Sequence, residues 1–535
     1  MKKNRLTYIK NILFPCLLFS IITGIFTGVL IFLFKVASSW ICLMPQEVYS
    51  YVSKHPLEIP LLTAIAALLG LAAALILKFC QDCRGGGIPT SIAILRGFID
   101  FSWIKSIFGL FASSMLTFLC GVPLGTEGPS VQMGTAVGRG TVRVFAKNNP
   151  AWDRYIMTGG ACAGFACATG APLSGIFFAF EEAHRRFSPM IFMIASMTVI
   201  SSMTVMNILC DIFAVEISLF GFYTDLILPL KYIWTAIIVG VACGVCAIVF
   251  TKLYKTIGNF IKTKLQKIPF ILKTVIVFAA VCLFGVVSVD CIGTGHSLIH
   301  NIMYGHGIWY ILILYLCVRS ILLIIANQVG VTGGLFVPTL AFGALTGALC
   351  AQGLIYLGIL PQKYFIIIVI TGIASFLSAS SRTPITAVTF AIEALCGLGN
   401  FLPIATGVTV AFLMIETASV PSFQETVVEA KAKQQHEGKS AYIVNMHLTV
   451  MPGSFAVGKE IRDILWPPTC TVLSVHKNSV PGEPGISEGD VLHVHYQTFD
   501  NERSVQMLEA LVGKQPSKSD MHSHIGGINH EVPEI

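Results

Sequence analysis

Three short loops of this 535-residue chain share one design, in which glycine residues come shortly before a proline. They are Gly85-Gly86-Gly87-Ile88-Pro89, Gly125-Thr126-Glu127-Gly128-Pro129 and Gly334-Leu335-Phe336-Val337-Pro338. Glycine allows a tight backbone turn, and proline is favoured in the first turn of a helix that follows. A helix N-terminus presents unpaired N–H groups and a partial positive charge. Three such ends converging in lipid predict a site for a small anion. The alternative is that these residues only loosen or pack membrane helices.

Glu127 lies inside the second of these loops. An ionisable residue within a membrane is costly, so it is by default a candidate for function. At an anion site, an ionised Glu127 would occupy the site itself and would leave it when protonated or displaced. The alternative is a structural role, in which the carboxylate only caps the helix that begins there.

A second acidic pair, Glu181 and Glu182, ends an apolar run and is followed by His184-Arg185-Arg186. The basic residues suggest the cytoplasmic side of a membrane. Adjacent residues point in different directions on a helix, so we expect only one of the two carboxylates to face the protein interior. An ordinary helix end with solvated charges is the alternative.

The elements that carry these residues are predicted to be membrane helices. Hydrophobic residues make up 54% of the chain and charged residues 12%, against about a quarter charged in soluble domains. Apolar stretches long enough to span a bilayer fall at about 11–34, 59–79, 106–122, 188–210, 232–252, 270–289, 308–326, 339–359, 364–378 and 399–415. Apolar pieces that are short or broken by Gly and Pro fall at 86–95, 128–140, 155–184, 334–345 and 383–396. We expect an all-α polytopic membrane protein of long and broken helices, whose broken segments line a cavity.

An internal repeat divides this region into two halves. Residues 163–183 resemble residues 375–395 at an offset of 212, and the loop from Gly125 lies 209 residues before the loop from Gly334. Transporter repeats commonly place the substrate site between them. The position that matches Glu127 in the second half is Phe336, so the acid is expected in one half only.

From about residue 441 the pattern becomes that of a small soluble α/β domain. Strands are predicted at 446–450, 471–475 and 491–496, and helices at 457–465 and 504–511. We assign 1–435 to the membrane domain, 441–513 to the soluble domain and 514–535 to a disordered tail. His493 and His495 share one strand face; a metal site there is the alternative to ordinary surface residues, and we expect no metal.

The three loops resemble the motifs of the CLC chloride channel and transporter family, over about residues 10–435. Gly85 to Pro89 stands where the family has Gly-Ser-Gly-Ile-Pro, and the other loops match Gly-Arg/Lys-Glu-Gly-Pro and Gly-x-Phe-x-Pro. The resemblance implies a dimer of inverted-repeat subunits with cytoplasmic termini. It implies that Glu127 is the external gate and Glu182 the internal proton-transfer residue. The backbone N–H groups of Leu335 and Phe336 would contact the anion.

Two departures from the family pattern remove hydroxyl donors. Gly86 replaces the usual anion-coordinating Ser, and Phe423 stands where the family has a Tyr before the last helix. A charge-assisted hydrogen bond contributes about 1.5–3 kcal/mol, so the site should be weaker or differently selective. Thr126 in place of a basic residue also removes a positive charge near the outer entrance.

The expected function is exchange of chloride or a related small anion for protons across the cell (inner) membrane. A passive anion channel gated by Glu127 is the alternative, and a ligand sensor in which the tail is the active part is a third. The soluble domain, 441–513, resembles the C-terminal module of potassium-uptake regulators (TrkA-C type), which implies ligand binding and dimerisation. We expect no enzymatic activity, no cofactor and no nucleic-acid partner; the net charge of +7 suits the positive-inside rule.

Overall fold

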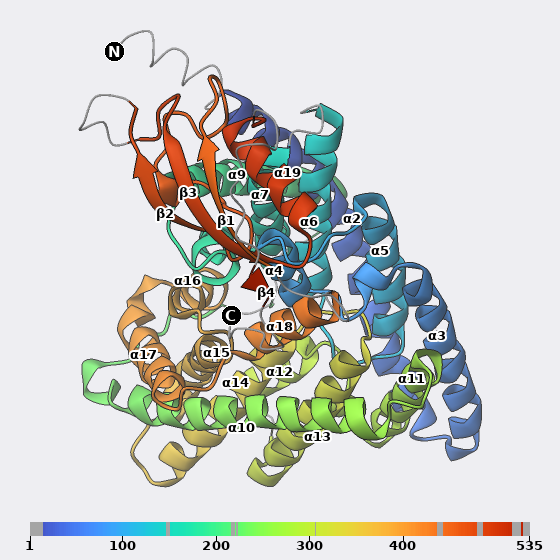
Figure 1. Ribbon diagram of the computed structural model, residues 1–535. Helices are drawn as coiled ribbons and strands as arrows, with labels where there is room; N and C mark the ends of the chain where they lie inside the picture. The colour runs from blue at the N-terminus through green and yellow to red at the C-terminus, as the bar shows by residue number, and fades with distance from the viewer. Residues whose placement is uncertain are drawn as a thin grey trace.

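The computed structural model describes residues 14–145, 150–215, 220, 223–304, 307–435, 442–478, 485–515 and 526–527. Figure 1 shows a large body of helices with a small sheet and helix at one end. The expected fold class, a polytopic helical body with a small α/β domain after it, is confirmed.

Nine helices in the described part of the chain are long and apolar enough to cross a membrane. Their bounds are α2 (Phe14–Val52), α3 (Ile59–Phe79), α9 (Pro189–Phe213), α10 (Thr235–Lys264), α11 (Phe270–Val287), α13 (Trp309–Val329), α14 (Phe336–Tyr356), α15 (Phe365–Ser381) and α17 (Phe401–Thr417). A tenth expected span, 106–122, forms α5 (Trp103–Leu119), a shorter apolar helix of 17 residues, at the lower end of the length needed to cross a bilayer. The predicted end of the first span at residue 34 is wrong, because the helix continues through Lys35 and Ser38 to Val52. Residues 11–13 of that span lie outside the described residues.

The broken segments form short or paired helices, as the Gly and Pro pattern indicated. They are α4 (Ile88–Leu95), α6 (Glu127–Phe145), α7 (Pro150–Thr169), α8 (Pro172–Phe178) with a π-helical turn η4 (Ala179–Ala183), and α16 (Pro384–Ala394). Two further helices, α12 (His296–Met303) and α18 (Phe423–Gln435), were not among the predicted segments. The two overlapping predicted stretches, 334–345 and 339–359, belong to one helix, α14, which runs from Phe336 to Tyr356.

The two halves meet through matching contacts. Gly125 and Gly334 exchange two backbone hydrogen bonds, N–H to O in each direction, both at 2.7 Å. Within the first half, α6 and α7 cross so closely that a Cβ added at Gly134 would lie 2.1 Å from Gly160 O. In the second half α14 and α15 cross in the same way, with 2.6 Å between a Cβ added at Gly343 and Gly372 O. These glycine positions are repeat-related, so the internal repeat is a structural one.

The soluble domain is a four-stranded antiparallel sheet with one helix. Its strand order is β2-β3-β1-β4, with β1 (Tyr442–Thr449), β2 (Thr471–His476), β3 (Val491–Thr498) and β4 (Gly526–Gly527). The helix α19 (Asn501–Val512) contributes Leu508 and Leu511 to a core shared with alternate residues of β1 and β3. In the tail, residues 516–525 and 528–535 lie outside the described residues.

The helix predicted at 457–465 is wrong. Gly458 has φ +80°, which an L-residue helix does not allow, and its N–H bonds Ile486 O. Ile486 N–H in turn bonds Lys459 O, so this segment pairs with residue 486 instead of coiling. A single 3₁₀ turn, η9 (Ile461–Asp463), is all that remains of the expected helix.

The soluble domain docks on the start of α7 (Figure 1). Arg154 donates to Leu465 O at 3.1 Å and to Trp466 O at 2.6 Å, and Tyr155 donates to Asp463 O at 2.6 Å. The Phe455 ring packs edge-on against Trp152 at 5.2 Å between centroids. The contact is therefore both hydrogen-bonded and aromatic.

Candidate functional site

The three glycine loops converge on one point. A Cβ added at Gly128 would lie 2.5 Å from Gly334 Cα and 3.0 Å from Gly87 Cα. Real Cβ atoms cannot approach that closely, so each loop needs glycine where it meets the others. The loops precede α4, α6 and α14, and the N-termini of these helices therefore lie together, as an anion site of the expected kind requires.

Glu127 is the first residue of α6 and its side chain is completely buried. Thr126 Oγ1 donates to Glu127 Oε1 at 2.8 Å, and the backbone amide of Val337 at the start of α14 interacts with the same carboxyl group. A Cβ added at Gly125 would lie 2.5 Å from Oε2, so the carboxyl group folds back over its own loop. The carboxyl group thus lies beside the N-termini of both halves, where a small anion would bind.

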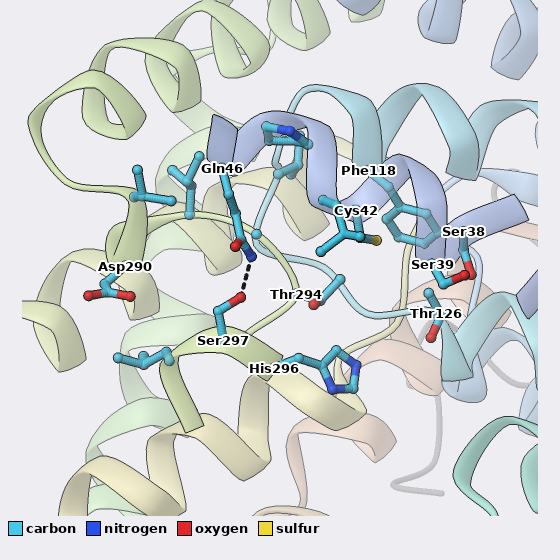
Figure 2. A pocket seen from close by; sticks show the side chains of 18 of the residues that line it. Ser38, Ser39, Cys42, Gln46, Phe118, Thr126, Asp290, Thr294, His296 and Ser297 are labelled. Atoms are coloured by element: carbon cyan, nitrogen blue, oxygen red, sulfur yellow. Dashed lines mark hydrogen bonds between the residues drawn. The ribbon is translucent and has the colours of Figure 1, made fainter. Parts of the chain in front are cut away.

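A pocket of about 240 Å³ lies beside this carboxyl group, between α2 and the segment that leads into α12. We call it the α2–α12 pocket. Figure 2 shows polar side chains from both walls, with a hydrogen bond from Gln46 to Ser297 across it. Its lining includes Lys35, Ser38, Cys42, Gln46, Thr126, Asp290, Thr294, His296 and Ser297.

Sequence reasoning missed His296, which lies 4.0 Å from Glu127, Nε2 to Oε1. The one sequence feature that could have pointed to His296 is its position directly after the glycine-containing turn Gly293-Thr294-Gly295, where the short helix α12 begins. Nothing in the spacing links that turn to Glu127, because the two lie far apart along the chain.

Gly86 has no room for a side chain. A Cβ there would lie 2.7 Å from Leu110 Cδ2 and 2.8 Å from Gln132 Oε1. Gln132 Oε1 also accepts the backbone N–H of Gly87 at 2.9 Å. Gln132 therefore occupies the space beside Gly86 and uses one of the loop amides that were expected to face an anion. Ile88 and Pro89 begin α4 and are buried.

Leu335 and Phe336 stand at the N-terminus of α14, and both are 5% exposed. The Phe336 ring packs edge-on between Phe165 at 5.0 Å and Phe390 at 5.2 Å. Their backbone N–H groups belong to the helix start that meets Gly128 and Gly125, as the repeat indicated.

Phe423 begins α18 and is 2% exposed. Its ring meets Phe250 at 5.9 Å and Tyr254 at 6.4 Å. The only hydroxyl in this trio, on Tyr254, donates to Asn327 Oδ1 at 2.6 Å. Phe423 is thus held in an aromatic cluster in which no hydroxyl is left over for an anion.

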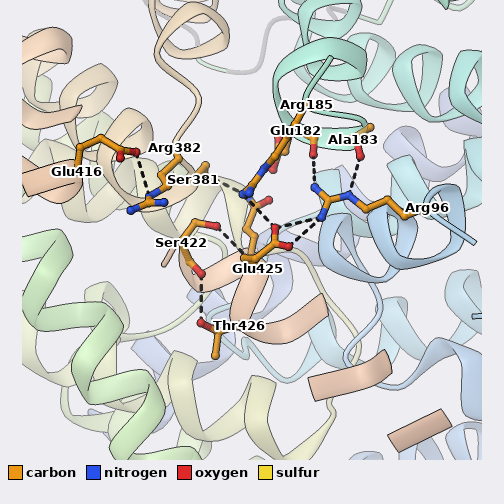
Figure 3. A network of polar contacts seen from close by, with 11 residues as sticks. Arg96, Glu182, Ala183, Arg185, Ser381, Arg382, Glu416, Ser422, Glu425 and Thr426 are labelled. Atoms are coloured by element: carbon orange, nitrogen blue, oxygen red, sulfur yellow. Dashed lines mark hydrogen bonds and ion pairs between the residues drawn. The ribbon is translucent and has the colours of Figure 1, made fainter. Parts of the chain in front are cut away.

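The acidic pair divides as expected, with one member facing the interior. Glu182 is buried and lies beside Gln424 of α18. Figure 3 shows Arg96 bridging this region, since it donates to Glu182 O at 3.1 Å and to Glu425 Oε1 at 2.9 Å. Arg185 Nη2 lies 3.0 Å from Glu425 Oε2. Glu182 therefore lies near a network of two arginines and one carboxylate.

Glu181 has a different partner, the N-terminus of α16. Its carboxylate accepts the backbone N–H groups of Ile385 at 2.8 Å and Thr386 at 2.7 Å, and the Thr386 hydroxyl at 2.7 Å. The solvated helix end considered as an alternative is therefore wrong for both glutamates.

The second half of the chain makes the equivalent contact with the first half. Glu393, the repeat partner of Glu181, accepts the backbone N–H groups of Leu173 at 2.8 Å and Ser174 at 2.9 Å at the start of α8. Each half thus supplies a carboxylate that caps a helix of the other half, a favourable place for negative charge. We call this the exchanged cap.

In the soluble domain, His493 stacks on His447 with 4.5 Å between ring centroids, and His495 Nδ1 lies 2.7 Å from Asn445 Oδ1. Within the described ranges, no group of three or more His, Cys, Asp or Glu side chains is placed to hold a metal ion.

Comparisons with known proteins identify the helical body. The family model described as voltage gated chloride channel matches residues 65–416. The H(+)/Cl(-) exchange transporters ClcA of Salmonella paratyphi B and Salmonella arizonae are each 27% identical over 433 and 431 residues, which cover 79% of this chain and 90% of each transporter.

Solved structures share the fold. That of a slow cyanobacterial Cl-/H+ antiporter matches with a TM-score of 0.70 at 23% identity, covering 79% of this chain and 99% of that one. A CLC-type fluoride/proton antiporter matches with a TM-score of 0.63 at 19% identity, covering 76% and 96%. With the family model spanning more than half of its length, the chain belongs to the voltage gated chloride channel family, known as CLC.

Proposed function

We propose that this chain is a multi-pass membrane transporter that exchanges chloride or a related small monovalent anion for protons. The observation that carries the proposal is the buried carboxyl group of Glu127 at the point where three helix N-termini meet. The similar proteins that are named as H(+)/Cl(-) exchangers support it. As in other members of its transporter family, the chain has no enzymatic role.

Protonation of Glu127 is the coupling step of the proposed cycle. Ionised, the carboxylate holds the position of an anion beside the N-termini of α6 and α14. Protonated, it loses its attraction to those helix ends and yields the position to an external anion. In either state the site holds one negative charge, from the carboxylate or from the bound anion, so the two occupy it in turn.

Glu182 is the proposed inner proton carrier. It lies at the opposite end of the half from Glu127, and Arg139, Arg143, Arg185 and Arg186 gather at that end of the helices. Basic residues favour the cytoplasmic side, so Glu182 faces inward and Glu127 and the α2–α12 pocket face outward. By the same rule we propose cytoplasmic N- and C-termini, and we propose the cell (inner) membrane as the location of the protein.

A liposome flux assay tests this function. Purified protein with an imposed chloride gradient should drive protons uphill, and Glu182→Gln should abolish proton movement while anion flux persists. Glu47→Gln, at an exposed position of α2, is the matched control and should behave as the native protein. Anion flux without any proton movement by the native protein would instead establish the alternative, a passive channel gated by Glu127.

The transported anion is proposed as chloride or a close relative. Gly86 and Phe423 leave the site without two hydroxyl donors, so backbone amides supply the contacts. Flux measured with chloride, bromide, nitrate and fluoride in turn would rank the anions. Exclusive transport of an anion outside this set would contradict the proposed substrate class.

For residues 441–513 we propose a TrkA-C-like regulatory domain that binds a small ligand, and for the whole chain a homodimer. The sheet with one covering helix suits such a module, and its contact with Arg154 and Tyr155 gives a route to the membrane helices. Removal of residues from 442 onward should alter transport rates or their response to nucleotides. Identical transport by the shortened chain would leave this domain without a regulatory role.

A further inference from the structure

His296 stands between the α2–α12 pocket and the buried Glu127. Its side chain is 32% exposed while that of Glu127 is 0% exposed, and Nε2 lies 4.0 Å from Oε1. The ring is held from the side by Phe220, 5.3 Å away between centroids. This imidazole therefore lines the pocket (Figure 2), and its Nε2 approaches the carboxyl group of Glu127.

The other charged or titratable groups around the pocket have different tasks. Lys35 of α2 donates to Ala168 O at the end of α7, at 3.3 Å, and its ammonium group also attracts the carboxyl group of Glu127. Arg319 of α13 donates to the backbone oxygens of Asp290, Ile292 and Gly293. The Asp290 side chain accepts from Asn301 at 3.3 Å.

Cys42 of α2 also lines the pocket. Thr126 lines it too, and its hydroxyl group donates a hydrogen bond to Glu127. A threonine hydroxyl does not change charge in the physiological range, whereas histidine changes charge between about pH 5 and 8. His296 is therefore the group at this wall suited to take up a proton from water and release it again.

We propose that His296 passes protons between the α2–α12 pocket and Glu127. The inference rests on the proposed function, in which Glu127 is protonated from outside. In the forward step the Nε2–H bond of the imidazolium breaks and an Oε1–H bond forms on Glu127. The neutral imidazole then takes a proton from hydronium in the external solution that fills the pocket, which leaves water, so the net result is one proton moved from outside to Glu127.

The present separation of 4.0 Å is longer than a hydrogen bond, so transfer requires a small movement of the ring or one bridging water. Either is available, because the ring borders a polar pocket of about 240 Å³, large enough for water. Positioned proton transfer contributes about 10²–10⁴-fold to a rate. Loss of His296 should therefore slow proton delivery to Glu127 strongly without removing the anion site.

The test uses the full chain in liposomes, with chloride-driven proton flux measured at external pH from about 5 to 8. His296→Gln should reduce proton flux at least 10-fold and flatten its dependence on external pH. His296→Ala should do the same, and external imidazole should restore much of the flux. His300→Gln, one turn further along α12 at an exposed position, is the matched control and should keep the native profile.

Each possible result either supports or overturns the proposed proton relay through His296. Proton flux in His296→Gln with the native size and pH profile overturns the relay while leaving the antiporter function standing. A uniform loss at every external pH, without rescue by imidazole, shows that His296 only holds the fold and also overturns the relay. Native protein that moves anions but no protons removes the proposed function itself, and the relay with it.

Discussion

Replacing Glu181 or Glu393 by Gln tests whether the exchanged cap holds the two halves together. Glutamine keeps one oxygen of the carboxylate and nearly the same shape, but it loses the negative charge and one acceptor. Glu393 accepts two backbone N–H groups, whereas Glu181 accepts two and the Thr386 hydroxyl in addition. A hydrogen bond to a charged group contributes about 1.5–3 kcal/mol, so each variant should lose about that much in free energy of unfolding.

The loss should be larger for Glu181→Gln, because three donors then share a single acceptor. Unfolding of the detergent-solubilised protein by denaturant measures the difference, with Glu416→Gln as the matched control. Glu416 forms an ion pair with Arg382 at 3.4 Å and is 43% exposed, so its replacement should cost under about 1 kcal/mol.

Glu181→Gln should also keep proton coupling, in contrast to its neighbour Glu182. If both cap variants unfold at the same denaturant concentration as Glu416→Gln, the carboxylates contribute no more than a surface pair and the reasoning is refuted. If Glu181→Gln abolishes proton movement while the fold stays intact, the division of roles between Glu181 and Glu182 is wrong.

Three further predictions concern separate parts of the molecule. Gly86→Ser and Gly86→Ala should destabilise the protein alike, by about 1–3 kcal/mol, because the added Cβ displaces Gln132; a stable Ser variant in unfolding assays would contradict this. Phe423→Tyr should tighten chloride binding by up to about 10-fold in calorimetry, and unchanged affinity would mean that the ring does not border the anion. Burial lowers the pKa of the Lys459 amine to about 7 in the soluble domain, so the folded domain binds fewer protons than the unfolded chain between about pH 7 and 10.5. Domain stability should therefore rise across that window, and Lys459→Met should remove the rise in denaturation experiments.

The glycine loops and the internal repeat were predictable because they depend on local rules. Gly-Pro spacing marks helix starts, and a constant offset between Gly125 and Gly334 reveals repetition without any knowledge of contacts. In the structure these two repeat-related glycines lie side by side and form a reciprocal backbone bridge. Glu127 was singled out because an ionisable residue within a membrane is costly, and the structure buries it completely.

Other features could not be predicted from the sequence, because they depend on contacts between segments that lie far apart along the chain. Glu181 and Glu393 were visible as repeat partners, yet only the crossing of α8 and α16 shows that each caps the other half. His296 becomes relevant to Glu127 only when the fold brings the first residue of α12 near the first residue of α6. The helix expected at 457–465 failed because a backbone pairing with Ile486 outweighed local helix preference.

The reciprocal bridge between Gly125 and Gly334 has a consequence for biosynthesis. In this bridge Gly125 and Gly334 each satisfy the backbone N–H and carbonyl of the other, although 209 residues, about half of the membrane domain, separate them along the chain. Closing so long a loop is slow compared with forming local helices. The first half is therefore synthesised and inserted while its loop still lacks a partner. The ion path forms only after the second half has also been inserted. Co-expression of the two halves as separate polypeptides would reconstitute the path only through their association.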